Sequence, residues 1–158
     1  MDKMPISAEG YFALKERLRI LKEIERPAAL DAVAKARELG DLSENADYKT
    51  AKDAQRNIDT EIRRLEAISD NSDVIDISAL SGDAVMFGAA VELKDGNGMK
   101  RRYRILSEYE SDPASCVIAI TSPLARGLIG KKCGDRCLIK TPSGEKEFEI
   151  LKVEYKWR

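Results

Sequence analysis

The 158-residue chain carries 27 basic and 28 acidic residues and no histidine, for a formal net charge of −1. That length suits one ordinary domain or two small ones, and the near-neutral balance argues against free nucleic acid as the main partner, which leaves a protein partner as the default. We expect a cytoplasmic protein with no membrane partner, because no apolar run approaches the roughly 20 residues of a membrane span and the N-terminus lacks the apolar core of a signal peptide.

The first predicted element is a long helix between Ser7 and Leu39. Apolar residues recur in it at spacings of three and four: Leu14, Leu18, Leu21, Ile24, Ala28 and Ala32. This is the pattern of one buried helix face. Pro27 should kink the helix or leave a hydrogen bond unmade, and Gly40 stands where the helix should end.

A second helix with the same spacing follows. Its predicted stripe is Ala51, Ala54, Ile58, Ile62, Leu65 and Ile68, and a polar cluster at 69–73 ends it. Two helices joined by a few residues predict an antiparallel hairpin over residues 1–75. About two apolar residues in seven are typical of a coiled-coil seam, so the hairpin should project from the rest of the chain.

The predicted tip of the hairpin, at residues 40–45, carries two carboxylates, Asp41 and Glu44. One interpretation is structural: Asp41 caps the second helix with Glu44 at the third helical position, or Ser43 is the cap instead. The other is functional. Two carboxylates can share a Mg²⁺ ion whose remaining ligands come from a partner, and an exposed Leu42 would then meet that partner or fold back.

Four basic residues flank this tip: Arg37, Lys49, Lys52 and Arg56. They either lie on solvated helix faces, paired to acidic neighbours such as Asp53 and Asp59, or guide a phosphate backbone toward the tip. Tyr48 either packs within the hairpin or stacks on a base.

The second half of the chain predicts a small α+β domain over residues 80–158, with a boundary near 71–80. Short β-branched and aromatic runs predict an antiparallel sheet: 85–93, 101–106, 116–121, 136–141 and 147–155. Between the third and fourth runs, Ser122 as N-cap, Pro123 at the first helical position and Gly130 beyond the end predict a short helix.

The three cysteines favour no specific site. They cannot all pair with one another, and without histidine they cannot complete a four-ligand zinc site. We interpret Cys116, Cys133 and Cys137 as small buried or half-buried hydrophobes. A weak metal or redox role for Cys133 and Cys137 is the alternative.

Two long motifs resemble those of a known family. They are ARELGDLSENADY at 36–48 and SPLARGLIGKKCGD at 122–135, the latter followed by IKTPSGEKEFEILKVEY. With VIDIS and VMFGAAVEL near the domain junction, the whole chain resembles the GreA/GreB family of bacterial transcript cleavage factors, most closely its GreA branch. The resemblance implies an FKBP-like fold for the C-terminal domain.

The resemblance also implies a function. The coiled coil would enter the secondary channel of bacterial RNA polymerase as a monomer, while the C-terminal domain docks at the channel rim. The protein would not be an enzyme itself, but would stimulate the polymerase's own cleavage of RNA whose 3′ end is backtracked. Asp41 and Glu44 would help to hold a Mg²⁺ ion in the polymerase active site, with no cofactor stably bound to the free protein.

Other site residues follow from the same resemblance. The positions expected near RNA are Arg37, Tyr48, Lys52 and Arg56. The positions expected to dock on the polymerase are Ser122, Pro123 and Arg126. Lys52 stands where the family commonly has arginine, so bidentate phosphate contact is not expected there. The modest basic patch predicts the short cleavage products of the GreA branch.

Two other functions compete with cleavage stimulation. A prolyl isomerase would use the FKBP-like domain, but fold does not carry function, and the aromatic residues stand mostly at strand positions suited to a core. They are Phe87, Tyr103, Tyr109, Phe148, Tyr155 and Trp157. A coiled-coil scaffold or chaperone-like arm would use the acidic tip only as a helix cap.

Overall fold

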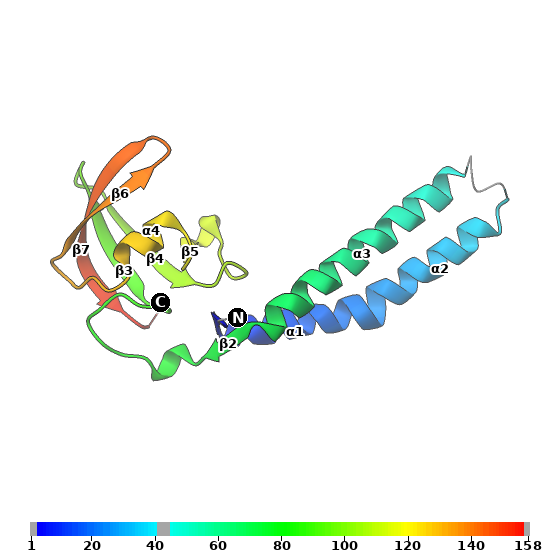
Figure 1. Ribbon diagram of the computed structural model, residues 1–158, viewed down its shortest axis with the longest axis horizontal. Helices are drawn as coiled ribbons and strands as arrows, with labels where there is room; N and C mark the ends of the chain where they lie inside the picture. The colour runs from blue at the N-terminus through cyan, green and yellow to red at the C-terminus, as the bar shows by residue number, and fades with distance from the viewer. Residues whose placement is uncertain (1–2, 41–44, 157–158) are drawn as a thin grey trace. The chain divides into compact units, whose positions relative to one another are not determined.

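The computed structural model describes residues 3–40 and 45–156, and the described chain divides into two compact units. The first is Tyr11–Ser72, and the second combines residues 3–10 with 73–156. The sequence predicted that residues 3–10 belong to the hairpin domain, whereas the structure groups them with the second unit. The predicted α+β class is confirmed, with a helical hairpin and a curled sheet (Figure 1).

The first unit is the antiparallel hairpin that the two apolar stripes predict. Its first arm contains α1 (Ala8–Ile20), the π-helical segment η1 (Leu21–Glu25) and α2 (Arg26–Arg37). Its second arm is α3 (Ala46–Asp70), which lies alongside α2 (Figure 1).

Pro27 accounts for η1. Proline has no N–H to donate to the carbonyl four residues earlier, and its ring clashes with that carbonyl. The helix widens by one residue just before it, so that the Arg26 N–H donates to the Leu21 carbonyl five residues back. The predicted disturbance at Pro27 is therefore confirmed, in the form of a π-turn.

The π-turn moves the buried stripe by one residue, which corrects part of the predicted core. A π-turn uses one more residue per turn than an α-turn, so each buried position after it lies one residue later than expected. The buried residues of α2 are Ala29, Val33 and Ala36. Ala28 and Ala32 are exposed, as is Ile24 at 56%. On α3, Ile62 and Leu65 are buried as predicted, whereas Ala54 is exposed.

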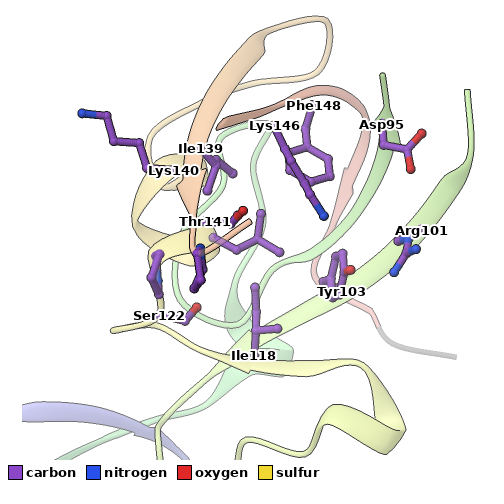
Figure 2. A pocket seen from close by; sticks show the side chains of 13 residues that line it. Asp95, Arg101, Tyr103, Ile118, Ser122, Ile139, Lys140, Thr141, Lys146 and Phe148 are labelled. Carbon is purple, nitrogen blue, oxygen red and sulfur yellow. The ribbon is translucent and has the colours of Figure 1, made fainter. Parts of the chain in front are cut away.

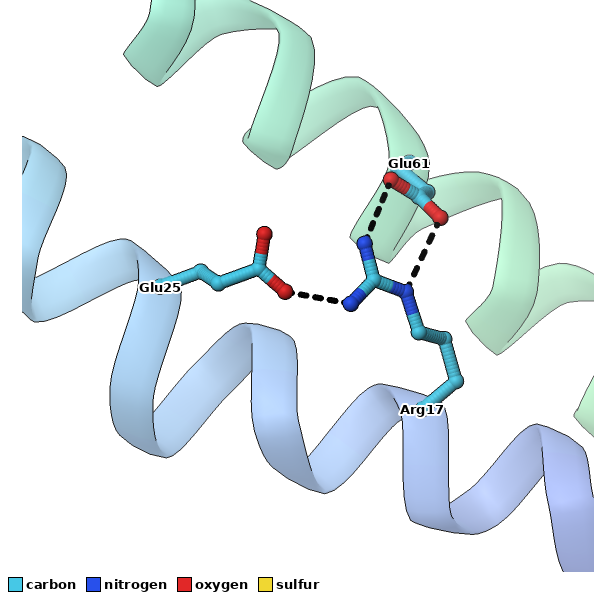
Figure 3. A network of polar contacts seen from close by, with 3 residues as sticks. All are labelled: Arg17, Glu25 and Glu61. Atoms are coloured by element: carbon cyan, nitrogen blue, oxygen red, sulfur yellow. Dashed lines mark hydrogen bonds and ion pairs between the residues drawn. The ribbon is translucent and has the colours of Figure 1, made fainter.

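Ion pairs cross the hairpin around the π-turn. The Arg17 guanidinium bonds Glu25 on its own arm and Glu61 on α3, 3.4 Å away (Figure 3). These hydrogen bonds raise the pKa of Arg17, and the bond to Glu25 makes the larger contribution. Arg26 pairs with Asp59 at 2.9 Å. Because these side chains are between 27% and 45% exposed, we expect their pairing to fix the alignment of the two arms and to add little to stability.

The second unit is a five-stranded sheet in the order β5-β4-β3-β7-β6. Its strands are β3 (Ala90–Asp95), β4 (Lys100–Leu106), β5 (Val117–Ala119), β6 (Arg136–Thr141) and β7 (Gly144–Glu154). Three neighbouring pairs are antiparallel, as predicted. The β4–β5 pair is parallel, because residues 107–116, which include the 3₁₀ helix η3 (Pro113–Ser115), carry the chain back until Val117 lies beside Arg104 in the second half of β4.

The core of this unit lies between the sheet and a short helix, α4 (Pro123–Leu128). Ser122 caps α4 by accepting the Ala125 N–H at 3.2 Å, and Pro123 begins the helix, as predicted. The predicted strand at 85–93 starts later, at Ala90. Gly88 adopts φ +89°, which suits glycine, and a Cβ at this position would lie only 3.1 Å from the Ile77 side chain, so the chain turns there.

Among the aromatic residues, Phe87 and Phe148 are buried, and Tyr103 and Tyr155 are half-buried against the core. This agrees with the predicted core role, and Trp157 lies outside the described residues. Tyr109 is half-buried as well.

Within the second unit, the Glu110 carboxylate links the N-terminal segment to the segment that follows β4. Strand β1 (Met4–Ser7) pairs with β2 (Ser72–Ile75), which the 3₁₀ helix η2 (Ile77–Ala79) follows. Glu110 accepts hydrogen bonds from the N–H and hydroxyl groups of both Ser7 and Ser107. Both serines are buried, so this carboxylate satisfies donors that would otherwise be costly to bury.

The cysteines match the predicted structural role only at Cys137. Cys137 is buried on β6, and this burial raises the pKa of its thiol. Cys116 and Cys133 are exposed, which differs from the expectation of buried or half-buried side chains. Within the described part of the chain, no helix is both long and apolar enough to cross a membrane.

Candidate functional site

The end of the hairpin lies between α2 and α3. Helix α2 ends at Arg37, and Gly40 follows with φ +117°, a left-handed conformation that suits glycine. Asp41 and Glu44, the two carboxylates predicted to act, lie outside the described residues, as do Leu42 and Ser43.

The N-cap of α3 corrects the structural interpretation of this segment. Helix α3 begins at Ala46, and Asn45 is its cap: the Asn45 Oδ1 accepts the Tyr48 N–H at 3.0 Å. The expectation that Asp41 or Ser43 caps this helix is therefore wrong. Asparagine is among the strongest N-cap residues, and here its side chain satisfies the Tyr48 N–H.

Asn45 also contacts the other arm. Its Nδ2 donates to the Ala36 carbonyl in the last turn of α2, at 2.7 Å. Asn45 was not among the functional residues predicted from the sequence. An asparagine directly before a helical run is a cap signal, but the second contact depends on the pairing of the two helices.

Arg37 and Tyr48 meet across the end of the hairpin. The Arg37 guanidinium carbon lies 5.8 Å from the centre of the Tyr48 ring, within the range of a cation–π contact. Tyr48 is half-buried and Arg37 is exposed, so part of each side chain faces solvent. Tyr48 therefore packs within the hairpin as one of the two interpretations expected, and part of its side chain stays exposed.

The remaining basic side chains follow α3 away from the tip. Lys52 donates to the Gln55 side chain at 3.4 Å, and Arg56 pairs with Asp53 at 3.6 Å. Lys49 is exposed. Asp59, an expected partner of this strip, pairs with Arg26 instead. Exposed pairs of this kind are weak, so a phosphate could replace them at little cost.

The predicted docking residues lie on and beside α4. Ser122 and Pro123 line a groove of about 320 Å³ between α4 and the sheet. Its floor includes the side chains of Tyr103, Ile118 and Phe148 (Figure 2). Arg126 is exposed on α4 and does not line the groove.

The rim of this groove carries more positive than negative charge. Arg101, Lys140 and Lys146 line it together with one carboxylate, Asp95. In Figure 2 the Lys140 amine points away from the groove, whereas Lys146 reaches over it from the β7 side. An apolar floor with a basic rim fits a partner that presents an apolar side chain beside acidic ones.

Comparison with known proteins gives the same family over both units. Residues 4–74 match the model described as "Transcription elongation factor, N-terminal", and residues 80–155 match "Transcription elongation factor, GreA/GreB, C-term". Transcription elongation factor GreA of Phenylobacterium zucineum is 47% identical over 156 residues, which cover 98% of this chain and 99% of that protein. The Hyphomonas neptunium GreA is 43% identical over 157 residues, or 99% of this chain and 100% of that protein.

A solved structure is also similar. The crystal structure of GreA factor homolog 1 (Gfh1) of Thermus thermophilus is 24% identical to this chain, with a TM-score of 0.46, and the match covers 96% of this chain and 99% of that one. Two family models that together cover almost the whole chain, and relatives above 40% identity over their full length, lead to one conclusion: the chain belongs to the GreA/GreB family of transcription elongation factors.

Proposed function

We propose that this chain stimulates the cleavage of backtracked RNA by bacterial RNA polymerase, and that the polymerase supplies the catalytic centre. The observation that carries the proposal is the position of Asp41 and Glu44 in the chain. Both fall in the eight residues, 38–45, that join the two arms of the hairpin. Asn45 is the N-cap of α3, so neither carboxylate occupies that position.

The dimensions of the hairpin support insertion into the secondary channel of the polymerase. Helix α3 has 25 residues, which corresponds to a length of about 38 Å. The buried residues of α2, which packs against it, are the small residues Ala29, Val33 and Ala36, so these two helices lie close together as a thin rod. A thin rod can pass through a channel that a globular domain cannot enter. The proposal concerns a monomer acting in the cytoplasm, where bacterial transcription takes place.

The chemistry of the two carboxylates fits Mg²⁺. This hard cation prefers oxygen ligands and commonly binds through one or two carboxylates, with its other positions filled by water or phosphate. Two carboxylates alone bind it weakly, so the polymerase and the RNA would supply the remaining ligands. Bound there, Mg²⁺ would stabilise the negative charge that develops on the phosphate.

The carboxylate oxygens would also act on the attacking water. A hydrogen bond from that water to Asp41 or Glu44 would orient it toward phosphorus, and the carboxylate would favour loss of its proton as the P–O3′ bond breaks. The exposed part of Tyr48, beside Arg37, offers a face for a base of the extruded RNA. Arg37, Lys52 and Arg56 would contact its phosphates.

Docking is proposed for the groove that Ser122 and Pro123 line. A partner helix at the rim of the channel would place an apolar side chain on Tyr103 and Phe148, and acidic groups near the basic rim. Arg126, exposed on the same helix, would extend this surface.

Pro123→Ala is expected to weaken polymerase binding by about 5- to 30-fold, the loss typical of one significant interface side chain. The substitution removes the ring from the groove, while alanine is still accepted at the first helical position. Pro113→Ala is the matched control, because Pro113 also begins a short helix and is exposed but lies outside the groove. Affinity is measured by titrating labelled factor with polymerase. Equal affinities for both variants would remove Pro123 from the docking surface, and unchanged affinity of Arg126→Ala would remove Arg126.

The proposed function is tested with a stalled, backtracked elongation complex. We expect the purified protein to accelerate release of a short 3′ RNA fragment, and to cleave no RNA without polymerase. A scaffold would bind the complex without accelerating cleavage, and that result would contradict the proposal.

A further inference from the structure

Glu110 binds two serines that are far apart in the chain. Its carboxylate accepts the Ser107 N–H at 3.2 Å and the Ser107 hydroxyl at 2.7 Å. It also accepts the Ser7 N–H at 3.2 Å and the Ser7 hydroxyl. Because both serines are buried, four donors depend on this one carboxylate and have little access to water as a substitute.

Residues 107–110 form a capping box of their own. In this motif a serine oxygen accepts the N–H of the residue three positions later, and the side chain of that residue accepts the serine N–H. The Ser107 hydroxyl oxygen accepts the Glu110 N–H at 3.3 Å, and Glu110 accepts the Ser107 N–H in return. The motif therefore orients the Glu110 side chain within its own turn.

At the start of α1, only half of a capping box is local. Ser7 directly precedes α1, and its hydroxyl oxygen accepts the Gly10 N–H at 2.9 Å. The residue that would return the second hydrogen bond is Gly10, which has no side chain. Glu110 accepts the Ser7 N–H instead, from 103 residues away in the chain. Its negative charge also suits the positive end of a helix.

Gly10 leaves the space that Glu110 occupies. A Cβ at position 10 would lie 2.7 Å from the Glu110 Cγ, well inside the roughly 3.5–4.0 Å at which carbon atoms pack. Any side chain at this position would therefore displace the carboxylate from Ser7. Glycine is the least favourable residue after proline inside a helix, so the contact with Glu110 is obtained at the expense of helix propensity.

We infer that Glu110 couples the start of α1 to the folding of the turn at 107–110, because it completes the cap of α1 only when that turn is formed. Helix α1 begins in the second unit, which includes residues 3–10, and continues into the hairpin from Tyr11. The first arm of the hairpin therefore starts as a fully capped helix only on a folded second unit. This inference does not depend on the proposed function, since the residues involved lie neither in the groove beside α4 nor at the tip.

Glu110→Gln tests the inference with little change in side-chain size. The amide cannot accept from all four donors, and its own NH₂ group can only donate. We expect hydrogen exchange at the Ser7 and Gly10 amides to become about 10- to 100-fold faster, as for the loss of a hydrogen bond to a charged group. Glu108→Gln is the matched control: Glu108 is an exposed carboxylate of the same turn that accepts the Thr121 hydroxyl at 3.3 Å, which an amide oxygen can also accept.

A double-mutant cycle with Gly10 separates this contact from a general loss of packing. Gly10→Ala should displace the Glu110 carboxylate and lower the melting temperature by roughly 5 °C or more. In a Glu110→Ala background, the same substitution should leave the melting temperature unchanged or raise it. The space is then free, and alanine favours the helix more than glycine does.

The outcomes decide between a coupling role and a general structural one. Wild-type exchange at Ser7 in Glu110→Gln would overturn the inference, as would an equal effect of Gly10→Ala in both backgrounds. The Ile105 and Ile150 amides, which are hydrogen-bonded in the body of the second unit, report global opening. They should exchange at the control rate, and acceleration there to the same extent as at Ser7 would also overturn the inference.

Discussion

Replacing Asp41 by asparagine or Glu44 by glutamine is expected to lower stimulated RNA cleavage by about 100-fold or more. Each substitution keeps the size of the side chain and removes a charge that would stabilise the metal and the attacking water. Such electrostatic contributions are worth several kcal/mol, and each 1.4 kcal/mol is about tenfold in rate. The measurement is the single-turnover cleavage rate of a backtracked complex at saturating factor.

Asp47→Asn is the control for this effect. Asp47 is an exposed carboxylate in the first turn of α3, three residues after Glu44 in the chain. It has the same charge and the same neighbourhood in sequence, but no proposed role, so we expect a near-normal rate. Binding to polymerase should be unchanged in all three variants. Full activity of both Asp41→Asn and Glu44→Gln would show that the tip carboxylates do not act in cleavage.

Leu128→Ala is expected to lower the unfolding free energy of the second unit by about 2–5 kcal/mol, because it leaves a cavity beneath α4. Leu128 is fully buried and holds α4 against the sheet. In a domain of this size, that loss lowers the melting temperature by roughly 8 °C or more. Since α4 follows Ser122 and carries Pro123, polymerase affinity should fall as well.

Leu138→Ala serves as the comparison for Leu128→Ala. Leu138 is a leucine of the same unit but is 62% exposed on β6, so its truncation should change stability by no more than about 0.5 kcal/mol. Thermal unfolding followed by circular dichroism measures both. Equal melting temperatures for the two variants would contradict the packing described for α4.

Local signals predicted most of the secondary structure. The cap of α4 required only the order of Ser122 and Pro123, and the helices of the hairpin required only apolar spacing. Apolar spacing alone could not predict which residues of the helix are buried after Pro27. Proline disturbs a helix in more than one manner, and only packing against α3 selects the π-turn that buries Val33 in place of Ala32.

The candidate site was predicted less completely. Asp41, Ser43 and Asn45 are all residue types that cap helices, and they stand within five positions of one another. Spacing alone could not choose among them, whereas the contact of Asn45 with Ala36 distinguishes it. The groove of the second unit brings together residues from β4, α4 and β7, which are far apart in the chain, so no local motif could outline it.

If the tip carboxylates complete a metal site in the polymerase, binding of the protein must change the Mg²⁺ dependence of cleavage. Cleavage rates of a backtracked complex are measured over a Mg²⁺ titration, without factor, with the wild-type protein, and with Asp41→Asn. We expect the wild-type protein to lower the half-saturating Mg²⁺ concentration and Asp41→Asn to leave it unchanged. A wild-type protein that accelerates cleavage with no change in Mg²⁺ dependence would contradict this role of the tip carboxylates.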